Sequence, residues 1–268
     1  PARHFALRSL DRILAEAWQP DRGLNHVIAY SDPSAARRDV PGLLDDYAFT
    51  VIACLDAYQT TADLSYFNFA RRIADAMIER FYDPVGGGFF DVERARSAGG
   101  ELGALAAARK PFQDSPTPAG NSAAAIALLR LHSYTNDPGY REKAEDTLEV
   151  FAGIAPQYGI FAGTYAIAAV MFSSPHVQVV VVGDGEEAER LGAAAIAPFA
   201  LNKAVLCLPE NEAIAQNLPP ALAETIPNVP GLKEGKTVAV VCSNFTCRPP
   251  IANAEELART LRDLISGK

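Results

Sequence analysis

Residues 81–91, FYDPVGGGFFD, form a glycine- and aromatic-rich loop that recurs in related form elsewhere in the chain. Gly88 in this loop lies 65 positions after Gly23 and 71 positions before Gly159. A weak repeat of this length, one helical hairpin plus its connections, is typical of stacked helix pairs. We therefore expect these loops at one end of a helical stack, where a functional site would lie. The related loops are residues 18–24 (WQPDRGL) and 157–161 (QYGIF).

Between these loops, apolar residues recur at helical spacing, as Leu44, Tyr47, Val51 and Leu55 do. Capping side chains precede prolines at Thr117-Pro118 and Asp137-Pro138, and such pairs are typical of helix starts. The pattern predicts six helices in three consecutive pairs. Their predicted ranges are 3–18, 43–61, 63–82, 118–135, 137–153 and 162–173.

After Phe172 the pattern changes to short β-branched runs. Residues 177–182 (VQVVVV) are apolar on both faces, as buried parallel strands are. Further strands are predicted at 203–208 and 237–242, with helices at 186–196 and 254–265. The fold class is therefore mainly α: a partial α/α toroid of three helical hairpins followed by a small α/β module. We place the helical hairpins in residues 1–174 and the α/β module, with parallel strands, in residues 175–268.

Composition excludes several classes of protein. The net charge of −8 and the scattered basic residues argue against a nucleic-acid surface. The longest apolar run, residues 161–172, is too short to span a membrane, and no basic and apolar leader is present. Four cysteines in a chain of 268 residues do not make a disulfide framework, so a cytoplasmic location is expected. We expect no cofactor and no metal.

Gly183-Asp184-Gly185 lies between a predicted strand and a predicted helix, where a dinucleotide-binding loop could lie. That fingerprint needs a third glycine three positions later, and the residue there is Ala188. A tight turn is the preferred interpretation.

Asp45-Asp46 opens a predicted helix. Carboxylates are stabilised there by free N–H groups and the helix dipole, so a capping role is the simplest interpretation. Adjacent helical residues point about 100° apart, so at most one of the pair points into a cleft while the other caps the helix. Residues 109–122, RKPFQDSPTPAGNS, collect polar side chains in a proline-stiffened loop. Two interpretations of this loop have equal weight: a rigid connection that leads into a capped helix, and a functional site.

Cys242 and Cys247 lie five positions apart, just after a predicted strand. They could form half of a zinc site, but no second Cys or His pair is near in sequence. A redox-active or structural thiol pair and two separate reduced thiols are the other interpretations.

Several of these motifs carry a resemblance to a known family. The chain resembles the thioredoxin-domain-containing proteins that include spermatogenesis-associated protein 20 and its bacterial relatives, over nearly its whole length. The motifs that resemble the family, in family order, are residues 44–49 (LDDYAF), residues 87–91 (GGFFD), Lys110 with Asp114, Pro118, Gly120, Asn121 and Ser122, and residues 241–247 with Pro250.

The resemblance implies a plan of an N-terminal thioredoxin-like domain followed by a toroid of the six-hairpin glycosidase type, a type that also includes sugar epimerases. This chain differs in carrying no thioredoxin-like domain and about half of the expected helices. It also has Ala119 where many relatives have serine before Gly-Asn.

Two functions from different classes follow as hypotheses. The first is a carbohydrate-active enzyme of glycosidase or epimerase type, acting on a small-molecule sugar at the glycine and aromatic loop face. The catalytic candidates are Asp46, Asp91, Asp114 and Lys110, and the substrate-binding candidates are Tyr47, Phe89, Phe90, Asn121 and Tyr158.

The second hypothesis is a non-catalytic interaction or thiol-redox module, in which Cys242 and Cys247 exchange with a thioredoxin-like domain. Because an open half-ring leaves apolar helix faces uncovered, we also expect a homodimer. Neither hypothesis includes a nucleic acid or a membrane as partner.

Overall fold

The structure is a computed structural model that describes residues 1–28, 40–93 and 108–267. The six predicted helices are all present, and each observed end lies within two residues of its predicted position. They are α1 (Ala2–Glu16), α2 (Leu44–Thr61), α3 (Leu64–Phe81), α5 (Gly120–Thr135), α6 (Pro138–Ala152) and α7 (Gly163–Ser173).

Local sequence explains the starts of α3 and α6. The Asp63 carboxylate accepts a hydrogen bond from Ser65 N–H at 2.8 Å and caps α3. Asp137 caps α6 through Gly139 N–H at 2.9 Å, with a proline at the first helical position as expected. The predicted cap at Thr117 is wrong, because α5 begins at Gly120 and its N-cap residue has no capping side chain of its own.

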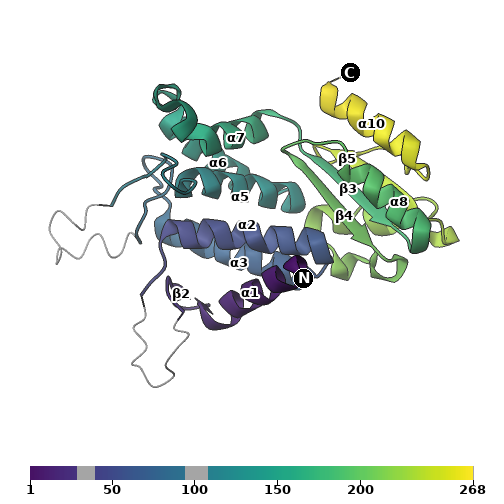
Figure 1. Cartoon of the computed structure of the whole chain (residues 1–268), viewed down its shortest axis with the longest axis horizontal. Helices are drawn as coiled ribbons and strands as arrows, with labels where there is room; N and C mark the ends of the chain where they lie inside the picture. The colour runs from purple at the N-terminus through teal and green to yellow at the C-terminus, as the bar shows by residue number, and fades with distance from the viewer. Residues whose placement is uncertain (29–39, 94–107, 268) are drawn as a thin grey trace.

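The helices form a layered stack (Figure 1). Helix α2 packs against α3 and α5, and α5 packs against α6 and α7. The first turns of α2, α5 and α7 meet at one end of this stack, as the contacts described below show. The stack is an open layer in the part of the chain that the structure describes, so the toroid class stays a prediction.

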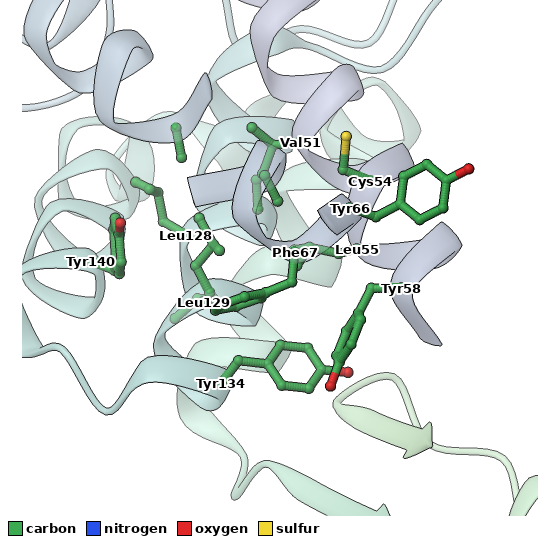
Figure 2. Close-up of a cluster of buried hydrophobic side chains, with 14 of the residues drawn as sticks. Val51, Cys54, Leu55, Tyr58, Tyr66, Phe67, Leu128, Leu129, Tyr134 and Tyr140 are labelled. Carbon is green, nitrogen blue, oxygen red and sulfur yellow. The ribbon is translucent and has the colours of Figure 1, made fainter. Parts of the chain in front are cut away.

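Aromatic rings fill the centre of the helical core (Figure 2). Tyr58 and Tyr134 meet edge to face with ring centroids 5.5 Å apart, and both lie near Phe67. All three side chains are almost completely buried. Edge-to-face pairs of this kind stabilise a core beyond the effect of their buried area. This cluster therefore joins α2, α3 and α5 into one rigid unit.

The C-terminal segment is a four-stranded sheet in the order β4-β3-β5-β6. Strands β3 and β4 are parallel and joined by helix α8 as a crossover, as predicted. The bounds are β3 (Val177–Val182), α8 (Gly185–Ile196), β4 (Lys203–Leu208), β5 (Val238–Ser243), β6 (Thr246–Cys247) and α10 (Ala254–Ser266).

The direction of β5 corrects the prediction of parallel strands, because β5 runs antiparallel to β3. The end of β4 at Leu208 and the start of β5 at Val238 both pair with Val182 at the end of β3. The connection between them therefore leaves and re-enters the sheet at the same end of the strands, and β5 runs in the reverse direction. Short helical turns, including α9 (Pro220–Ala223), build this connection along the helical module.

The two faces of the sheet lie in different cores. Val180, Val182 and Val240 belong to the core of the helical hairpins. Val179 and Val181 point the other way and pack with α8 and α10, including Leu257. This explains why the run at 177–182 is apolar at every position but one. The change of architecture falls at Ser174, the C-cap of α7, and the core continues across it.

Among the described residues, no single helix has the length and apolar composition needed to cross a membrane. One pair of helical segments, Pro138–Ala152 with Ala155–Ser173, meets that length and composition test together but is bent by 108°.

Candidate functional site at the starts of three helices

The starts of α2 and α5 lie in direct contact. A Cβ atom added to Gly120 would lie 2.0 Å from Asp45 Oδ1 and 3.1 Å from the Leu44 side chain. Leu44 N–H also donates to the Asp91 carbonyl at 3.1 Å, which ties the loop after α3 to the first turn of α2. Glycine at position 120 is thus required by the close approach of Asp45.

Asp46 caps helix α2. Its Oδ2 accepts hydrogen bonds from Leu43 N–H and from the His26 ring, each at 2.8 Å. This is the position at which a carboxylate folds back on the residue before the helix. Asp46 is predicted as catalytic, and in the structure its Oδ2 is bonded to groups at the helix start.

Asp45 is the carboxylate of the pair that points toward α5, and the prediction of catalytic residues omitted it. Among the described residues, none donates a hydrogen bond to its side chain. Burial raises the pKa of Asp45, and the Asp46 and Asp91 carboxylates raise it further. The predicted helix start at residue 43 made Asp45 the third helical residue, whereas the helix begins at Leu44 and makes Asp46 the third. This shift of one residue decides which carboxylate caps.

Asp91 lies close enough to Asp45 to influence its ionisation. One oxygen of Asp91 accepts Arg109 N–H at 2.9 Å, and its own N–H donates to the Arg109 carbonyl at 2.8 Å. The structure therefore brings together three carboxylates, those of Asp45, Asp46 and Asp91, at the start of α2.

Lys110 is held in an ion pair rather than beside these carboxylates. Its Nζ donates to Asp83 Oδ2 and to the Gly87 carbonyl, each at 2.6 Å. The ammonium also lies 5.0 Å from the centre of the Phe90 ring. The Lys110 hydrogen bond is the main reason that the pKa of Asp83 falls to about 2. Lys110 thereby fixes the glycine loop at residues 83–90.

Asp114 connects the starts of α5 and α7. Its Oδ1 accepts Ala119 N–H at 2.9 Å, and its Oδ2 accepts Thr164 N–H at 2.7 Å. Both oxygens are bound to the main chain, so this residue, predicted as catalytic, lies in a capping position for two helices.

Three of the predicted substrate-binding residues lie beneath the surface. Asn121 is fully buried, and its amide binds both the N–H and the carbonyl of Phe89, which is also fully buried. Tyr47 is fully buried, and its hydroxyl accepts Leu24 N–H at 2.9 Å. These residues hold the glycine loops against the helix starts and offer no surface to a ligand.

The remaining predicted aromatic residues are partly accessible. Tyr158 is 38% exposed and stands edge to face against Phe112, with ring centroids 4.8 Å apart. Phe90 is half-buried under Lys110. Aromatic faces of this kind can stack on the apolar face of a sugar ring.

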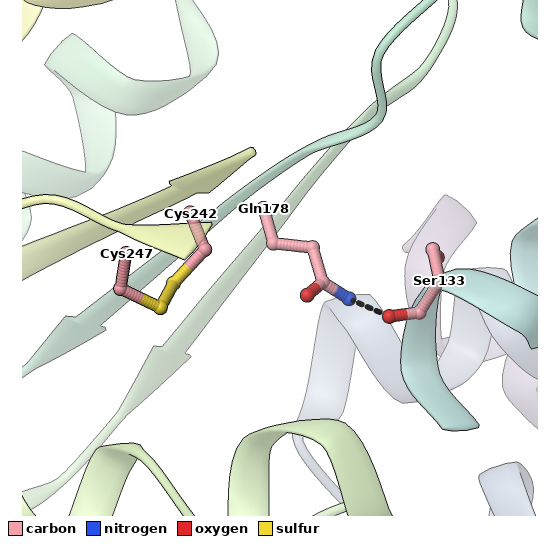
Figure 3. The surroundings of a disulfide bond; sticks show 4 residues. All are labelled: Ser133, Gln178, Cys242 and Cys247. Atoms are coloured by element: carbon pink, nitrogen blue, oxygen red, sulfur yellow. Dashed lines mark hydrogen bonds between the residues drawn. A yellow bond between two sulfur atoms is a disulfide. The ribbon is translucent and has the colours of Figure 1, made fainter. Parts of the chain in front are cut away.

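Cys242 and Cys247 form a disulfide bond across the β5–β6 hairpin (Figure 3). Their Cα atoms are 3.9 Å apart, and the two residues pair directly in the antiparallel register. The zinc interpretation and the interpretation as two separate reduced thiols are wrong, because each sulfur is bonded to the other. No cluster of three or more His, Cys, Asp or Glu suited to a metal occurs in residues 1–28, 40–93 and 108–267.

The fold and site define a mainly α protein of helical hairpins that carries a small α/β module. No family model matches the chain. Human spermatogenesis-associated protein 20 is 29% identical to it over 224 residues, which cover 82% of this chain and 27% of that protein. The mouse protein of the same name is 39% identical over 112 residues, or 41% of this chain and 13% of that protein.

An uncharacterized protein of Caenorhabditis elegans is 25% identical over 239 residues, covering 85% of this chain and 30% of that protein. The chain thus spans between about an eighth and a third of the length of these curated relatives. The likeness to the spermatogenesis-associated protein 20 family, indicated by the sequence motifs, is confirmed.

Proposed function

We propose that the end of the helical stack where α2, α5 and α7 begin is a carbohydrate-active site of glycosidase or epimerase type. The observation that carries the proposal is the half-buried Asp45 carboxyl, whose pKa is raised by burial and by two neighbouring carboxylates. Glycoside cleavage needs one carboxyl group that stays protonated and a second that is ionised.

In this proposal Asp45 is the general acid and Asp91 is the ionised partner. Asp91 uses one oxygen to accept Arg109 N–H, which leaves its second oxygen for a water molecule or a sugar carbon. Asp46 contributes negative charge that helps to keep Asp45 protonated. In this proposal the accessible parts of Tyr158 and Phe90 are the aromatic surfaces that contact the sugar.

The experiment is an assay of the chain with a panel of α- and β-linked 4-nitrophenyl glycosides, and with mannose for epimerase or isomerase turnover. We expect Asp45→Asn to lower the turnover rate by at least about 100-fold, which is the typical effect of losing a general acid. Asp263→Asn, on the exposed face of α10, is the matched control and should leave turnover unchanged. If no member of the panel turns over faster with the wild-type chain than with Asp45→Asn, the proposal is wrong.

A second function, thiol-disulfide exchange with a thioredoxin-like domain, is favoured by the Cys242–Cys247 bond. Cys242 is buried and Cys247 is partly accessible, so an incoming thiolate would attack Sγ of Cys247 and release Cys242 as the thiolate. The partner's second thiol would then release Cys247, leaving the partner oxidised and this chain reduced.

Alkylation and mass spectrometry after incubation with reduced thioredoxin test this exchange. We expect two alkyl groups to be added per exchange, and a trapped mixed disulfide when the thioredoxin lacks its second thiol. The variant Cys247→Ser should abolish the trapped species, and Cys207→Ser is the control, since Cys207 lies in β4 as a free thiol. A disulfide that stays oxidised in the folded chain would rule out exchange.

A second copy of this chain is the proposed protein partner. The segment before α7 and the outer face of α7 expose apolar side chains, among them Ile160 at 86% and Phe161 at 50%. Covering such a surface is a common reason for dimerisation. Light scattering should give a dimer that Ile160→Ser weakens, while a monodisperse monomer would contradict the proposal.

A further inference from the structure

A pocket lies at the opposite end of the helical stack from the candidate site, where the helices meet the sheet. Its volume is about 370 Å³, and it is built from the end of α5, the start of α6, the end of α7 and the β5–β6 hairpin. The residues of this pocket that carry the inference are His132, Arg141, Phe172, His176, Asn202 and Phe245. None of the described residues that line it carries a carboxylate.

The described residues that line this pocket include a guanidinium and no carboxylate, although the net charge of the whole chain is −8. His132, Arg141 and His176 come from three different segments and meet here. Burial lowers the pKa of His176, and the nearby His132 and Arg141 lower it further. A guanidinium and two imidazoles with no carboxylate among the described lining residues, inside an acidic protein, favour an anionic ligand.

His176 has an unsatisfied polar atom. The residue is only 8% exposed, and its Nε2 is buried without a hydrogen-bond partner among the described residues. Its ring is held edge to face by Phe245, with centroids 4.5 Å apart. Buried polar atoms in native proteins almost always have a partner, so this nitrogen indicates a ligand or a bound water.

Arg141 is fixed in place with bonding capacity to spare. Its guanidinium stacks over the Phe172 ring at 4.1 Å, and its only hydrogen bonds to the described residues are long contacts of 3.5 Å to the Phe172 carbonyl. Asn202 Nδ2 donates to the Met171 and Ser174 carbonyls at 2.9 and 3.1 Å. Asn202 therefore engages two of the carbonyl groups at the end of α7, and Arg141 reaches the third, that of Phe172, only at 3.5 Å.

We propose that this pocket binds an oxyanion, the phosphate or carboxylate group of a small molecule, between the Arg141 guanidinium and the His132 and His176 imidazoles. A guanidinium presents N–H groups in a planar fork that matches such a group. The ligand also supplies the hydrogen-bond partner that His176 Nε2 lacks among the described residues. This site is independent of the proposed carbohydrate site, which lies at the other ends of α5 and α7.

The four histidines of the chain allow a direct test with an internal control. In a chain labelled at the histidine rings, inorganic phosphate should shift the NMR signals of His132 and His176 saturably. His4 and His26 lie in the N-terminal part of the chain, away from this pocket, and should not respond. Glucose 6-phosphate and acetate are titrated in parallel, with chloride at matched ionic strength. Saturation by either phosphate assigns a phosphate group, and saturation by acetate alone assigns a carboxylate.

Arg141→Gln should weaken the affinity for the saturating anion by about tenfold or more, because a charged hydrogen bond is lost. Arg262→Gln, an exposed arginine on α10, is the matched control and should bind as the wild type does. If Arg141→Gln does not fold, Arg141→Lys keeps the charge without the fork and should bind more weakly than the wild type. Linear shifts, shifts of equal size at all four histidines, or an equal response to chloride would overturn the proposal, and water would then be the partner of His176.

Discussion

Asp114 and Thr164, 50 positions apart in the chain, are joined by a hydrogen bond of 2.7 Å from the Thr164 N–H to the Asp114 carboxylate. The second oxygen of the same carboxylate accepts Ala119 N–H. One side chain thus satisfies free N–H groups at the starts of α5 and α7, which are otherwise left without intrahelical partners.

We expect Asp114→Ala to lower the free energy of unfolding by about 1–3 kcal/mol, since it removes two capping bonds at once. Asp137→Ala is the matched control, because Asp137 caps only α6 and its loss should cost about 1 kcal/mol. Urea unfolding followed by circular dichroism measures both. Equal losses for the two variants would contradict the double-cap role.

The contact between Gly120 and Asp45 gives a second prediction. Gly120→Ala places a methyl group against the Asp45 carboxylate and the buried Leu44, and should destabilise the chain by about 1–3 kcal/mol. It should also push Asp45 toward water, so that the pKa of Asp45 falls toward its ordinary value.

Gly153→Ala is the matched control for this substitution. Gly153 has φ −72° and no atom within 4 Å of an added Cβ, so the change should be neutral or slightly stabilising. Urea unfolding and a carboxyl NMR titration measure the two effects. An Asp45 pKa that does not move in Gly120→Ala would show that burial at this contact does not raise it.

The Lys110–Asp83 pair makes stability depend on pH in acid. The pKa of Asp83 is lowered to about 2 in the folded chain, against about 3.9 for an unperturbed aspartate. The stabilisation is therefore present above pH 4 and is lost as the pH falls toward 2. Lys110→Met should lose less stability than the wild type over this range. Urea midpoints between pH 5 and 2.5 test this, and parallel curves for the two proteins would refute it.

His176 should make the stability of the fold depend on pH in a higher range than Asp83 does. Burial lowers its pKa to about 4, with smaller contributions from His132 and Arg141, while an unfolded histidine titrates near 6.5. As pH falls from 6.5 to 4 the unfolded chain binds a proton that the folded chain does not, so stability decreases by up to ~3 kcal/mol.

His176 also lines a neighbouring pocket between α2, α5 and β4. Among the described residues, the charged and titratable groups around the two pockets are His132, Arg141, Asp56, Arg130, Tyr134 and Lys203. His176→Asn should flatten this part of the pH profile, whereas the exposed His4→Asn should not. Equal slopes for both variants and the wild type would show that His176 titrates normally in the folded chain.

The helices and strands could be predicted closely because their signals are local. Apolar spacing, Asp63 and the Asp137-Pro138 pair fix helix ends without reference to the rest of the chain. The β4 range at 203–208 was likewise predicted to the residue. Local preferences were sufficient here because the same residues also face the core.

The contacts between side chains at the candidate site could not be predicted from the sequence, because they join distant segments. Which of Asp45 and Asp46 caps α2 changes with a shift of one residue in the helix start. The burial of Asn121 between Phe89 and Pro111 depends on how two loops pack. No local pattern in the sequence contains that information.

The direction of β5 and the disulfide between Cys242 and Cys247 also depend on the path of the chain in space, which the local sequence does not show. An antiparallel β5 follows from the path of the long connection after β4, which has little periodicity of its own. The disulfide follows from the tight hairpin at Asn244-Phe245, where both residues have positive φ. Spacing of five residues alone left three interpretations open.

The inner face of the sheet, with Val180 and Val240, is part of the same core as α2 and α5. Cutting the chain at Ser174 would therefore leave both pieces with a bare apolar surface, and neither would keep its packing. The helical hairpins and the sheet should melt in one cooperative transition. The proposed anion pocket lies along this seam, so a ligand bound there would contact both halves and should raise the melting temperature of the whole chain.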